Sequence, residues 1–451
     1  MKIKLIAPHE SGETLISSAE TFKVQKLALP LLAALTPEGH EVKLVDEAFA
    51  PDDVNEEVDL VGITVLTDLV PRAYRLADLY RARGVRVVLG GMHPSVLPRE
   101  ALKHADAVVV GEGEESWPRL VEDAAAGRLR RIYRSEKMTD LKKLPRPRRD
   151  LYPDPGTKGY TPVATTVEAS RGCVFRCEFC SISRVMGQGH RVRPPADVAA
   201  EIESIESPNL FFVDDSLALN RHVAGKLFQE IAPLKKFWVG QGSVSLAEDT
   251  DLLRAMRRSG CLGLLVGLES VQMEARGEMK KFNGLRISFK EAMQRFHGEG
   301  IGILGAFIFG FDHETGDVFD RTLEFSLKHR LEGVELRILV PFPGTRLYAR
   351  LLSEKRLFAP GWWLNGYSSD MLLFKPGGMS PRELLDGFTR VNRQIYSYGA
   401  IARRIFGVSP FKRRATGCRL VVGFNLATRK RYFKSLDAEQ PFAGLAESNY
   451  R

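Results

Sequence analysis

The first 135 residues alternate short apolar runs with segments of helical periodicity. The runs KIKLIA, EVKLVD, VDLVGITVL, VRVVLGG and ADAVVVG predict β-strands that begin at residues 2, 41, 58, 85 and 105. Residues 20–39 and 70–84 carry apolar positions at helical spacing and end on glycine. This α/β alternation predicts a doubly wound, Rossmann-like parallel sheet, whose ligands lie at the carboxyl ends of the strands.

A second alternating unit follows a basic, proline-rich segment. Its predicted strands are TTVEAS, NLFFVDDS, FWVGQGSVS, LGLLVGLES, GILGAFIFGF and GVELRILVPF, all within residues 165–342. Helical patterns such as residues 194–207 and 248–260 separate these strands. Six strand–helix units predict a partial (β/α)6 TIM-type barrel, and the active sites of such barrels lie at the C-terminal ends of the strands.

The pattern becomes mostly helical beyond residue 360. Ser380, followed three residues later by Glu383, predicts a capping box at the start of a helix. The predicted division of the chain is a Rossmann-like domain over 1–140, a linker over 141–160, a barrel over 161–360 and a small basic, mostly helical region over 361–451.

Charge is distributed unevenly along the chain. The net charge is +9, but residues 387–436 hold 12 Lys and Arg and no Asp or Glu. Such a segment attracts anionic lipid, nucleic acid or an acidic partner, and a helical cap with solvated charges is the alternative. No run approaches the ~20 apolar residues of a membrane span, and the N-terminus lacks a signal-peptide pattern. We expect a cytoplasmic protein, with peripheral contact at the inner membrane face as a further expectation.

Three of the five cysteines lie together directly after the first predicted barrel strand. Cys173, Cys177 and Cys180 have the spacing C-x3-C-x2-C. Structural zinc takes four ligands, usually in paired knuckles, and no second knuckle accompanies this one, although His190 could supply a fourth ligand. The other interpretation is a [4Fe–4S] cluster on three thiolates with one iron left open.

This spacing, with an aromatic residue before the last cysteine, resembles the radical SAM superfamily. The resemblance implies a [4Fe–4S] cluster, S-adenosylmethionine (SAM) on its open iron, and a low-potential electron donor such as flavodoxin or ferredoxin. A 5′-deoxyadenosyl radical would then remove hydrogen from an unactivated carbon. The residues that the resemblance assigns to SAM are Phe179, Asp215, Gln241, Ser243 and Glu269. The alternative for the polar ones is a helix cap or a loop hydrogen bond.

The first domain has no cysteine in residues 1–150, which excludes the second cluster of methylthiotransferases. Its T-x-L and G-G elements resemble those of cobalamin-binding domains, while the histidine of the family's D-x-H-x-x-G element is absent. The resemblance therefore implies cobalamin without a histidine ligand from the protein. The residues assigned to cobalamin are Thr64, Leu66, Thr67, Asp68, Gly90, Gly91, His93, Gly111, Glu112 and Gly113.

The two domains together resemble cobalamin-dependent radical SAM enzymes, and PFPGTRLYARL and GWWLNGY resemble a branch that includes hopanoid C-2 methylases. The resemblance implies methylation of an unactivated carbon of a small, hydrophobic molecule, with methylcobalamin as the donor. No triad or paired-carboxylate signature indicates a catalytic protein residue. Asp214, Trp362 and Tyr367 are candidates for the substrate pocket.

Two alternatives to methylation remain from the sequence. One keeps the cofactors but ends in cyclisation, rearrangement or oxidation without methyl transfer. The other is a cluster- or cobalamin-based sensor that binds nucleic acid through the basic segment, although no standard DNA-binding pattern is present.

Overall fold

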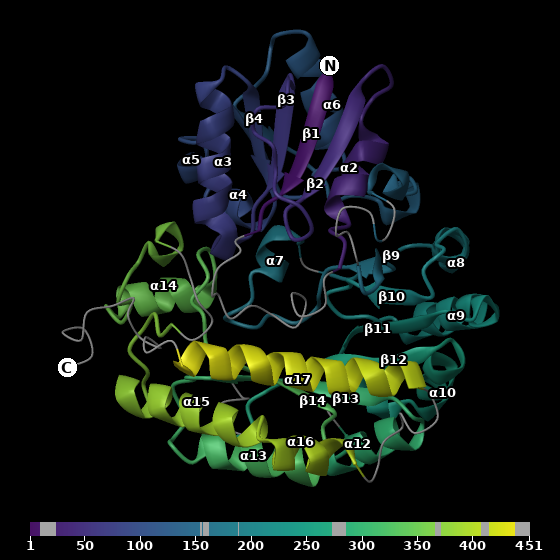
Figure 1. Ribbon diagram of the computed structural model, residues 1–451, viewed down its shortest axis with the longest axis vertical. Coiled ribbons are helices and arrows are strands. Elements are labelled where there is room, and N and C mark those ends of the chain that lie inside the picture. The colour runs from purple at the N-terminus through teal and green to yellow at the C-terminus, as the bar shows by residue number, and fades with distance from the viewer. Residues whose placement is uncertain are drawn as a thin grey trace.

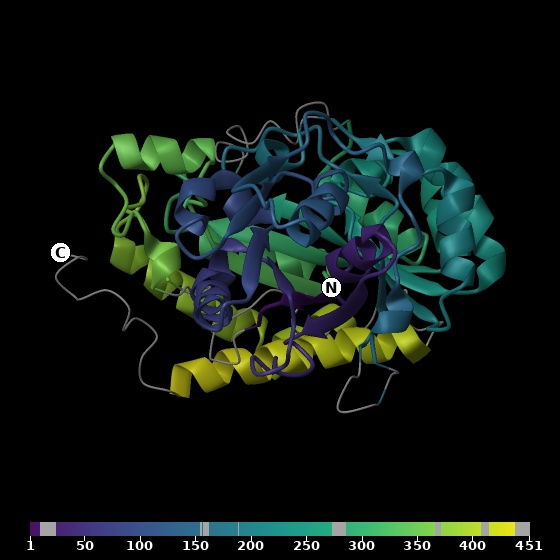
Figure 2. The same ribbon diagram turned by 90° about the horizontal axis from the view of Figure 1, so that it is seen from above.

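A computed structural model shows an upper α/β domain standing on a lower barrel domain (Figure 1). The view from above places the N-terminal sheet over the barrel strands (Figure 2). The structure describes residues 1–9, 24–153, 156, 162–187, 189–272, 286–365, 371–406 and 415–437.

The upper domain contains a six-stranded, wholly parallel sheet in the order β2-β1-β3-β4-β5-β6. The strands are β1 (Lys2–Ala7), β2 (Glu41–Asp46), β3 (Leu60–Thr64), β4 (Arg86–Gly90), β5 (Ala107–Val110) and β6 (Ile132–Arg134). The order reverses direction at β1 and β3, as in a doubly wound sheet. The first five strands are those that the apolar runs predict.

Helices cover both faces of this sheet. They are α2 (Ala28–Leu35), α3 (Val70–Ala82), α4 (Met92–Val96), α5 (Pro98–Ala101) and α6 (Ser116–Ala125). One buried cluster packs α3 against the sheet, and a second, which includes Trp117, packs α2 and α6 against the other face. The helix predicted over 20–39 is shorter in the structure. It ends at Leu35 because Thr36 precedes Pro37 and takes an extended conformation.

The lower domain contains a second parallel sheet in the order β14-β13-β12-β11-β10-β7. Its strands are β7 (Thr165–Val167), β10 (Asn209–Phe212), β11 (Phe237–Gly242), β12 (Cys261–Glu269), β13 (Gly302–Phe309) and β14 (Gly333–Ile338). The end strands β7 and β14 are not neighbours in the sheet, so the barrel is the partial one that the sequence predicts. The predicted strand TTVEAS is split into β7 and a short β8 (Ser170–Arg171), which pairs with β9 (Arg191–Val192).

Helices cover the outside of this sheet and bury one large apolar core against it. They are α7 (Ile182–Val185), α8 (Pro195–Glu203), α9 (Arg221–Ile231), α10 (Thr250–Arg258), α12 (Phe289–Gly298), α13 (Val318–Lys328) and α14 (Arg346–Ser353). The short α7 lies between the upper and lower domains (Figure 1).

The C-terminal region is helical, as predicted, with α15 (Pro381–Ile395), α16 (Tyr398–Ile405) and α17 (Ala415–Asp437). The predicted capping box is confirmed: the Ser380 hydroxyl accepts from the Glu383 amide at 3.2 Å, and the Glu383 carboxylate accepts from the Ser380 amide at 2.7 Å. The buried Arg404 joins α16 to α17 by donating to Asn425 at 2.8 Å, and Asn425 donates to the Glu332 carbonyl beside β14 at 2.8 Å.

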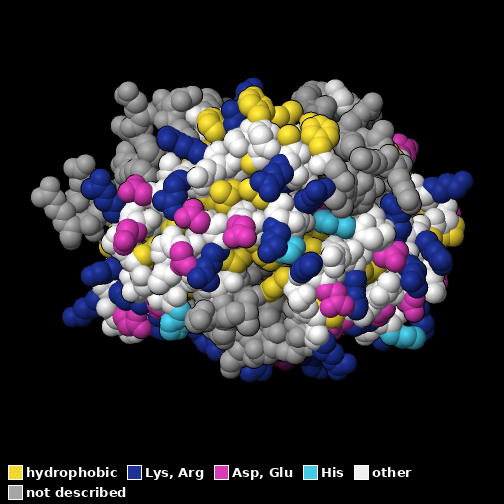
Figure 3. Space-filling view, turned by 90° about the horizontal axis from the view of Figure 1, so that it is seen from below, with side chains coloured by type: hydrophobic (Ala, Val, Ile, Leu, Met, Phe, Trp, Pro, Cys, Tyr) yellow, Lys and Arg dark blue, Asp and Glu magenta, His cyan; other side chains and the backbone are white. Residues whose placement is uncertain are grey.

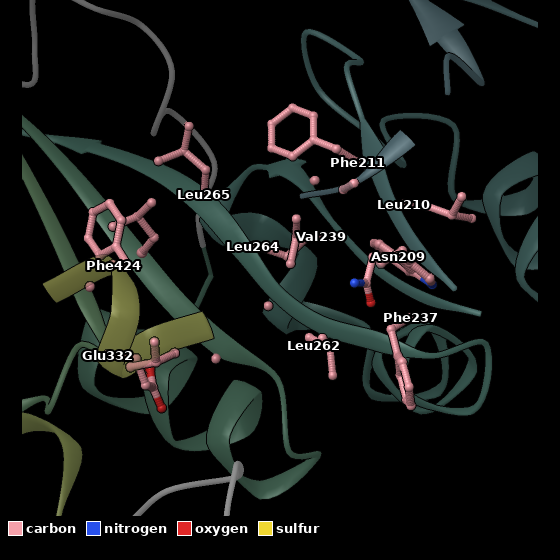
Figure 4. A pocket seen from close by; sticks show the side chains of 18 of the residues that line it. Asn209, Leu210, Phe211, Phe237, Val239, Leu262, Leu264, Leu265, Glu332 and Phe424 are labelled. Atoms are coloured by element: carbon pink, nitrogen blue, oxygen red, sulfur yellow. The ribbon is translucent and has the colours of Figure 1, made fainter. Parts of the chain in front are cut away.

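A cavity of about 140 Å³ lies over the N-terminal parts of the barrel strands (Figure 4). Phe211, Val239 and Leu265 are typical of its lining, and Phe424 of α17 lies over it. Glu332 is the one charged residue among the described residues that line it, and its carboxylate accepts from the Ile303 amide at 2.8 Å. This end of the barrel is therefore apolar, and the polar groups gather at the opposite end.

Candidate cofactor sites between the two domains

The three clustered cysteines lie in the loop between β8 and α7, at the carboxyl end of the first barrel strand. Cys173, Cys177 and Cys180 are each partly buried. The loop leaves β8 through Gly172, whose φ is +88° and whose Cβ, if present, would lie 2.5 Å from the Gly189 carbonyl oxygen. Glycine is therefore required at this close approach.

Two elements anchor this cysteine loop. At its start, the Gly172 amide donates to Asp215, which follows β10, at 2.8 Å. Near its end, the Glu178 carbonyl accepts from the Leu347 amide at 3.1 Å, and the Glu178 carboxylate accepts from Arg350 of α14 at 2.6 Å. These contacts fix both ends of the cysteine loop.

The thiols do not form a single-ion site. No three His, Cys, Asp or Glu side chains in the described part of the chain come together as ligands of one metal ion. His190, the candidate fourth zinc ligand, is held near the Ser216 backbone, and burial lowers its pKa. An iron–sulfur cluster has a different requirement, because its thiolates bind separate iron atoms. Three partly buried thiols on one anchored loop fit that requirement.

Asp214 is a structural link between the first two barrel strands. One carboxylate oxygen accepts from the Ser170 hydroxyl at 2.5 Å and the other from the Ala169 amide at 3.1 Å. Burial raises its pKa to about 7. Its oxygens are thus occupied by the residues that lead to the cysteines. Asp214 lines neither the apolar cavity at the far end of the barrel nor a second cavity that lies between the two domains.

The predicted SAM residues occupy neighbouring strand ends. Gln241 is partly exposed near the end of β11, and Ser243 is buried just beyond it. The Ser243 hydroxyl accepts from the Ser245 amide at 3.3 Å, which is the cap geometry that the alternative interpretation describes. Phe179 packs edge-on against Phe311, with ring centroids 5.9 Å apart.

Glu269 has an unusual backbone conformation. It is the last residue of β12, its φ is +59°, and the pairing register between β12 and β13 shifts at this position. A left-handed conformation is uncommon for a residue with a side chain, and such strain gathers at functional sites. Its position at the open end of the barrel makes Glu269 a strong candidate among the predicted SAM residues.

A second cavity, of about 310 Å³, lies between the upper and lower domains. Its volume is in the range of small-molecule sites. The predicted cobalamin residues that line it are Thr64, Leu66, Gly90, Gly91, Glu112, Gly111 and Gly113. The barrel contributes Glu168, Arg171, Met186 and Val213 to the same cavity. It therefore extends from the carboxyl ends of the upper strands to the start of the cysteine loop.

Glycines shape this cavity. Gly91 has φ +100°, and a Cβ there would lie 2.9 Å from the Val65 backbone nitrogen, so no other residue fits. Gly111 has φ +84° and no atom within 4 Å of a Cβ position, so a side chain would occupy the open space itself. Leu66 is apolar and 44% exposed, and its side chain also lines this cavity.

No histidine lines this cavity within the described residues. His93, which the sequence assigns to cobalamin, is fully buried and points elsewhere: its Nε2 lies 3.0 Å from the Glu100 carboxylate. Thr67 and Asp68 do not line the cavity either. Burial raises the pKa of Asp68, and the charge of Arg337 on β14 opposes that rise.

An ion-pair network borders the cavity, and sequence reasoning missed most of it. Arg171 of β8 lies 2.6 Å from Glu114, 3.2 Å from Glu112 and 2.8 Å from Glu168. Arg191 lies 2.5 Å from Glu112. Burial would raise the pKa of Glu112, but hydrogen bonding to Arg191 and the charge of Arg171 hold it down at about 2. The repeated acidic residues of GEGEE were the available signal.

Trp362 is a candidate for the substrate pocket that lies away from both cavities. Trp362 is buried in the apolar cluster of the upper domain, and its indole donates to the Pro341 carbonyl at 3.2 Å. It lines neither of the two cavities described above. The neighbouring Trp363 donates to Glu100 at 3.0 Å and so joins the two domains. Tyr367 lies outside the described residues.

Comparisons with known proteins agree with this architecture. Residues 16–121 match the B12 binding domain, and residues 167–326 match the radical SAM superfamily. A solved structure of the radical SAM methyltransferase TsrM from Kitasatospora setae, with cobalamin and a [4Fe-4S] cluster bound, has a TM-score of 0.71 over 96% of this chain and 99% of that one, at 16% identity. The fold and the two sites thus define a cobalamin-binding radical SAM enzyme.

Sequence relatives narrow this class. Bacteriochlorophyllide d C-8(2)-methyltransferase of Chlorobaculum tepidum is 30% identical over 350 residues, 71% of this chain and 75% of the relative. Hopanoid C-2 methylase of Rhodopseudomonas palustris is 24% identical over 352 residues, 73% of this chain and 64% of the relative. The chain belongs to the cobalamin-dependent radical SAM methyltransferases, whose cofactors are a [4Fe–4S] cluster, SAM and cobalamin, as the cysteine spacing and the first domain predict.

No helix in the described segments is both long and apolar enough to cross a lipid bilayer.

Proposed function

We propose that this methyltransferase acts on an unactivated carbon of a hydrophobic, ring-containing molecule of the tetrapyrrole class. The observation that carries the proposal is the cavity shared by the two domains, which joins the cobalamin-type loops to the start of the cysteine loop. Similarity to an enzyme named for bacteriochlorophyllide supports the substrate class. Exposed Leu66 and Val213, at 44% and 37%, give this space apolar walls.

The protein's part in this reaction is to bind, orient and exclude water. When bound, the cluster with SAM supplies a radical that removes hydrogen, and cobalamin supplies the methyl group. Cys173, Cys177 and Cys180 would hold the cluster, and Glu269 and Gln241 stand at strand ends where SAM would be oriented. We assign the glycine-shaped cavity to cobalamin without a histidine ligand, because no histidine lines it in the described part of the chain.

The substrate proposal is tested by anaerobic turnover with SAM, a low-potential reductant and a chlorin carrying an unmethylated side chain. We expect the product to gain one CH2 unit, with formation of both 5′-deoxyadenosine and S-adenosylhomocysteine. Hopene, as a polycyclic hydrocarbon, is the matched competitor. Methylation of hopene but not of the chlorin would contradict the proposed substrate class. Deoxyadenosine without S-adenosylhomocysteine would indicate instead the cyclisation or oxidation outcome.

We also propose peripheral contact with an anionic membrane through α16 and α17. Apolar side chains are exposed on these helices, with Tyr398 at 67%, Leu426 at 45% and Val422 at 38%. Arg403 and Arg393 line a groove beside them, and Figure 3 shows hydrophobic side chains among Lys and Arg on the underside. Basic residues interspersed with apolar ones favour an anionic membrane surface.

Vesicle co-sedimentation tests the membrane contact. We expect Arg403→Glu to reduce binding to phosphatidylserine-containing vesicles at low salt, because each basic residue near such a surface contributes about 1 kcal/mol. Lys103→Glu, which makes the same charge change on the upper domain, should not reduce it. Equal binding by both variants would contradict a surface formed by α16 and α17.

A further inference from the structure

Arg171 occupies the junction between the two proposed cofactor loops. It is the last residue of β8, directly followed by Gly172 and Cys173, so it begins the cysteine loop. Its guanidinium extends out of the barrel and contacts the loop after β5. This loop also lines the cavity assigned to cobalamin. Arg171 itself lines that cavity. The side chain of Arg171 therefore contacts a loop that lines the cobalamin cavity, and its backbone begins the cysteine loop.

The contacts of Arg171 use most of its donors. Nη1 donates to Glu114 at 2.6 Å on the cobalamin side. Nε and Nη2 donate to the two oxygens of Glu168 at 2.9 and 2.8 Å on the barrel side. Such a fork-to-fork pair fixes the plane of the guanidinium as well as its position. The charge of Glu168, with those of Glu114 and Glu112, outweighs burial and raises the pKa of Arg171, so the group stays cationic.

A second arginine closes the network from the other side. Arg191 donates to Glu112 at 2.9 and 2.5 Å, and the Thr139 amide donates to the same carboxylate at 2.7 Å. Thr139 also donates through its hydroxyl to Glu114 at 3.3 Å. Arg191 belongs to β9, the strand paired with β8. The two-stranded ribbon that leads into the cysteine loop is thus joined to residues 112–114 through two arginines.

We propose that Arg171 is a positioning residue that sets the separation and orientation of the cluster relative to cobalamin. The inference rests on the proposed function, because it assigns those cofactors to these two loops. Methyl transfer needs the substrate carbon to face both cofactors in turn, so a small displacement of one loop separates hydrogen removal from methylation. A misplacement of about 1 Å can lower a rate about 100-fold.

The test compares Arg171→Lys with Arg193→Lys. Lysine keeps the charge but, as a point charge, cannot form the two-pronged pair with Glu168 and reach Glu114 as well. Arg193 is the control, since it is buried, pairs with Glu201 at 2.6 Å and reaches Glu168 only at its backbone carbonyl, at 2.8 Å, without a hydrogen bond or ion pair to residues 111–114. Glu114→Gln is the second variant. It weakens the same contact with Arg171 through a side chain of the same shape, so it tests the inference if Arg171→Lys fails to fold.

Two readouts separate positioning from simple folding. Pulsed EPR on enzyme holding cob(II)alamin and the reduced cluster measures the distance between these two paramagnetic centres without turnover. We expect a shifted or broadened distance distribution in Arg171→Lys and Glu114→Gln, and an unchanged one in Arg193→Lys. In turnover we expect the ratio of 5′-deoxyadenosine to methylated product to rise about tenfold or more in the first two variants.

The outcomes distinguish this inference from the proposed function. If wild-type enzyme methylates and both Arg171→Lys and Glu114→Gln keep its distance distribution and product ratio, the positioning role of Arg171 is wrong. If wild-type enzyme binds no cobalamin, or methylates no chlorin, the proposed function fails on its own account. A distance change confined to Arg193→Lys would also overturn the inference.

Discussion

Glycines at the loop tips of the upper domain show how single residues shape the site. Gly91 is required by its backbone, because a Cβ would overlap the Val65 backbone. Gly113 differs, since its φ is ordinary and a Cβ would meet only Leu32 at 3.4 Å. A side chain at residue 113 is thus compatible with folding but extends into the cavity. A substitution at residue 113 can therefore test ligand binding in this cavity without unfolding the protein.

Gly113→Val should abolish or weaken cobalamin binding while the protein stays folded. Filling a packed site costs about 1–3 kcal/mol, which corresponds to about fivefold to 140-fold in affinity. Absorbance titration with hydroxocobalamin measures the affinity, and thermal unfolding of the apoprotein checks the fold. Gly225→Val on α9, where nothing lies within 4 Å of a Cβ, is the control. Unchanged affinity in Gly113→Val would place cobalamin elsewhere.

Asp214 predicts a pH dependence of stability. Its ordinary pKa is 3.8, and burial raises it to about 7 in the folded protein. Between these values the folded state keeps a proton that the unfolded chain has lost, so stability is full at low pH and falls as pH rises through about 7. In Asp214→Asn the amide can still pair with Ser170 and the Ala169 amide, so the part of this fall that Asp214 contributes should disappear. Denaturant midpoints of the wild type and of Asp214→Asn at pH 5 and pH 8 measure this contribution. The same change of midpoint with pH in the two proteins would refute the assignment.

At the scale of elements, the apolar pattern predicted the strands well and their ends less well. Eleven of the strands form inside apolar runs because parallel strands are buried on both faces. The sequence gives little sign of β6, which has three residues and an Ile132 that is 45% exposed. The break between β7 and β8 falls at Glu168, whose carboxylate turns toward Arg171. This ion pair joins residues only three positions apart, on the two sides of the break.

The candidate site was predictable only where its residues form a contiguous motif. Local spacing was enough to single out Cys173, Cys177 and Cys180, and Gly90–Gly91, because each motif is contiguous. The partners of Arg171 were not predictable, since Glu112 and Glu114 belong to the other domain and meet it only after both sheets form. His93 shows the converse, because its place in a motif-like stretch gave no sign of its burial against Glu100.

The link between α16, α17 and β14 yields an element-scale prediction. Arg404 is 1% exposed, and its Nη1 and Nη2 donate to the Leu331 carbonyl at 3.0 Å and to Asn425 at 2.8 Å. Asn425→Ala leaves a buried guanidinium short of an acceptor, which costs about 1–3 kcal/mol. Denaturation should show that loss, and hydrogen exchange should rise in α17 before the barrel. Unchanged exchange in α17 would mean that Asn425 does not hold this helix.

For the whole molecule, two parallel sheets present the carboxyl ends of their strands to one shared space. The upper sheet contributes glycine-rich loops, and the barrel contributes the cysteine loop. The opposite end of the barrel is closed by α17 over an apolar cavity that carries no comparable set of polar groups in its described lining. This arrangement explains why one chain can bring two cofactors to a single substrate.

The most direct test of the account is the cofactor content and SAM chemistry of the same anaerobic preparation, compared between wild type and Cys177→Ala. We predict about four irons and one cobalamin per wild-type chain, with cleavage of SAM to 5′-deoxyadenosine. Cys177→Ala should lose the iron and the SAM cleavage but keep cobalamin, because the cobalamin cavity does not include this cysteine. Full SAM cleavage by Cys177→Ala, or wild-type protein that binds iron but no cobalamin, would contradict the account.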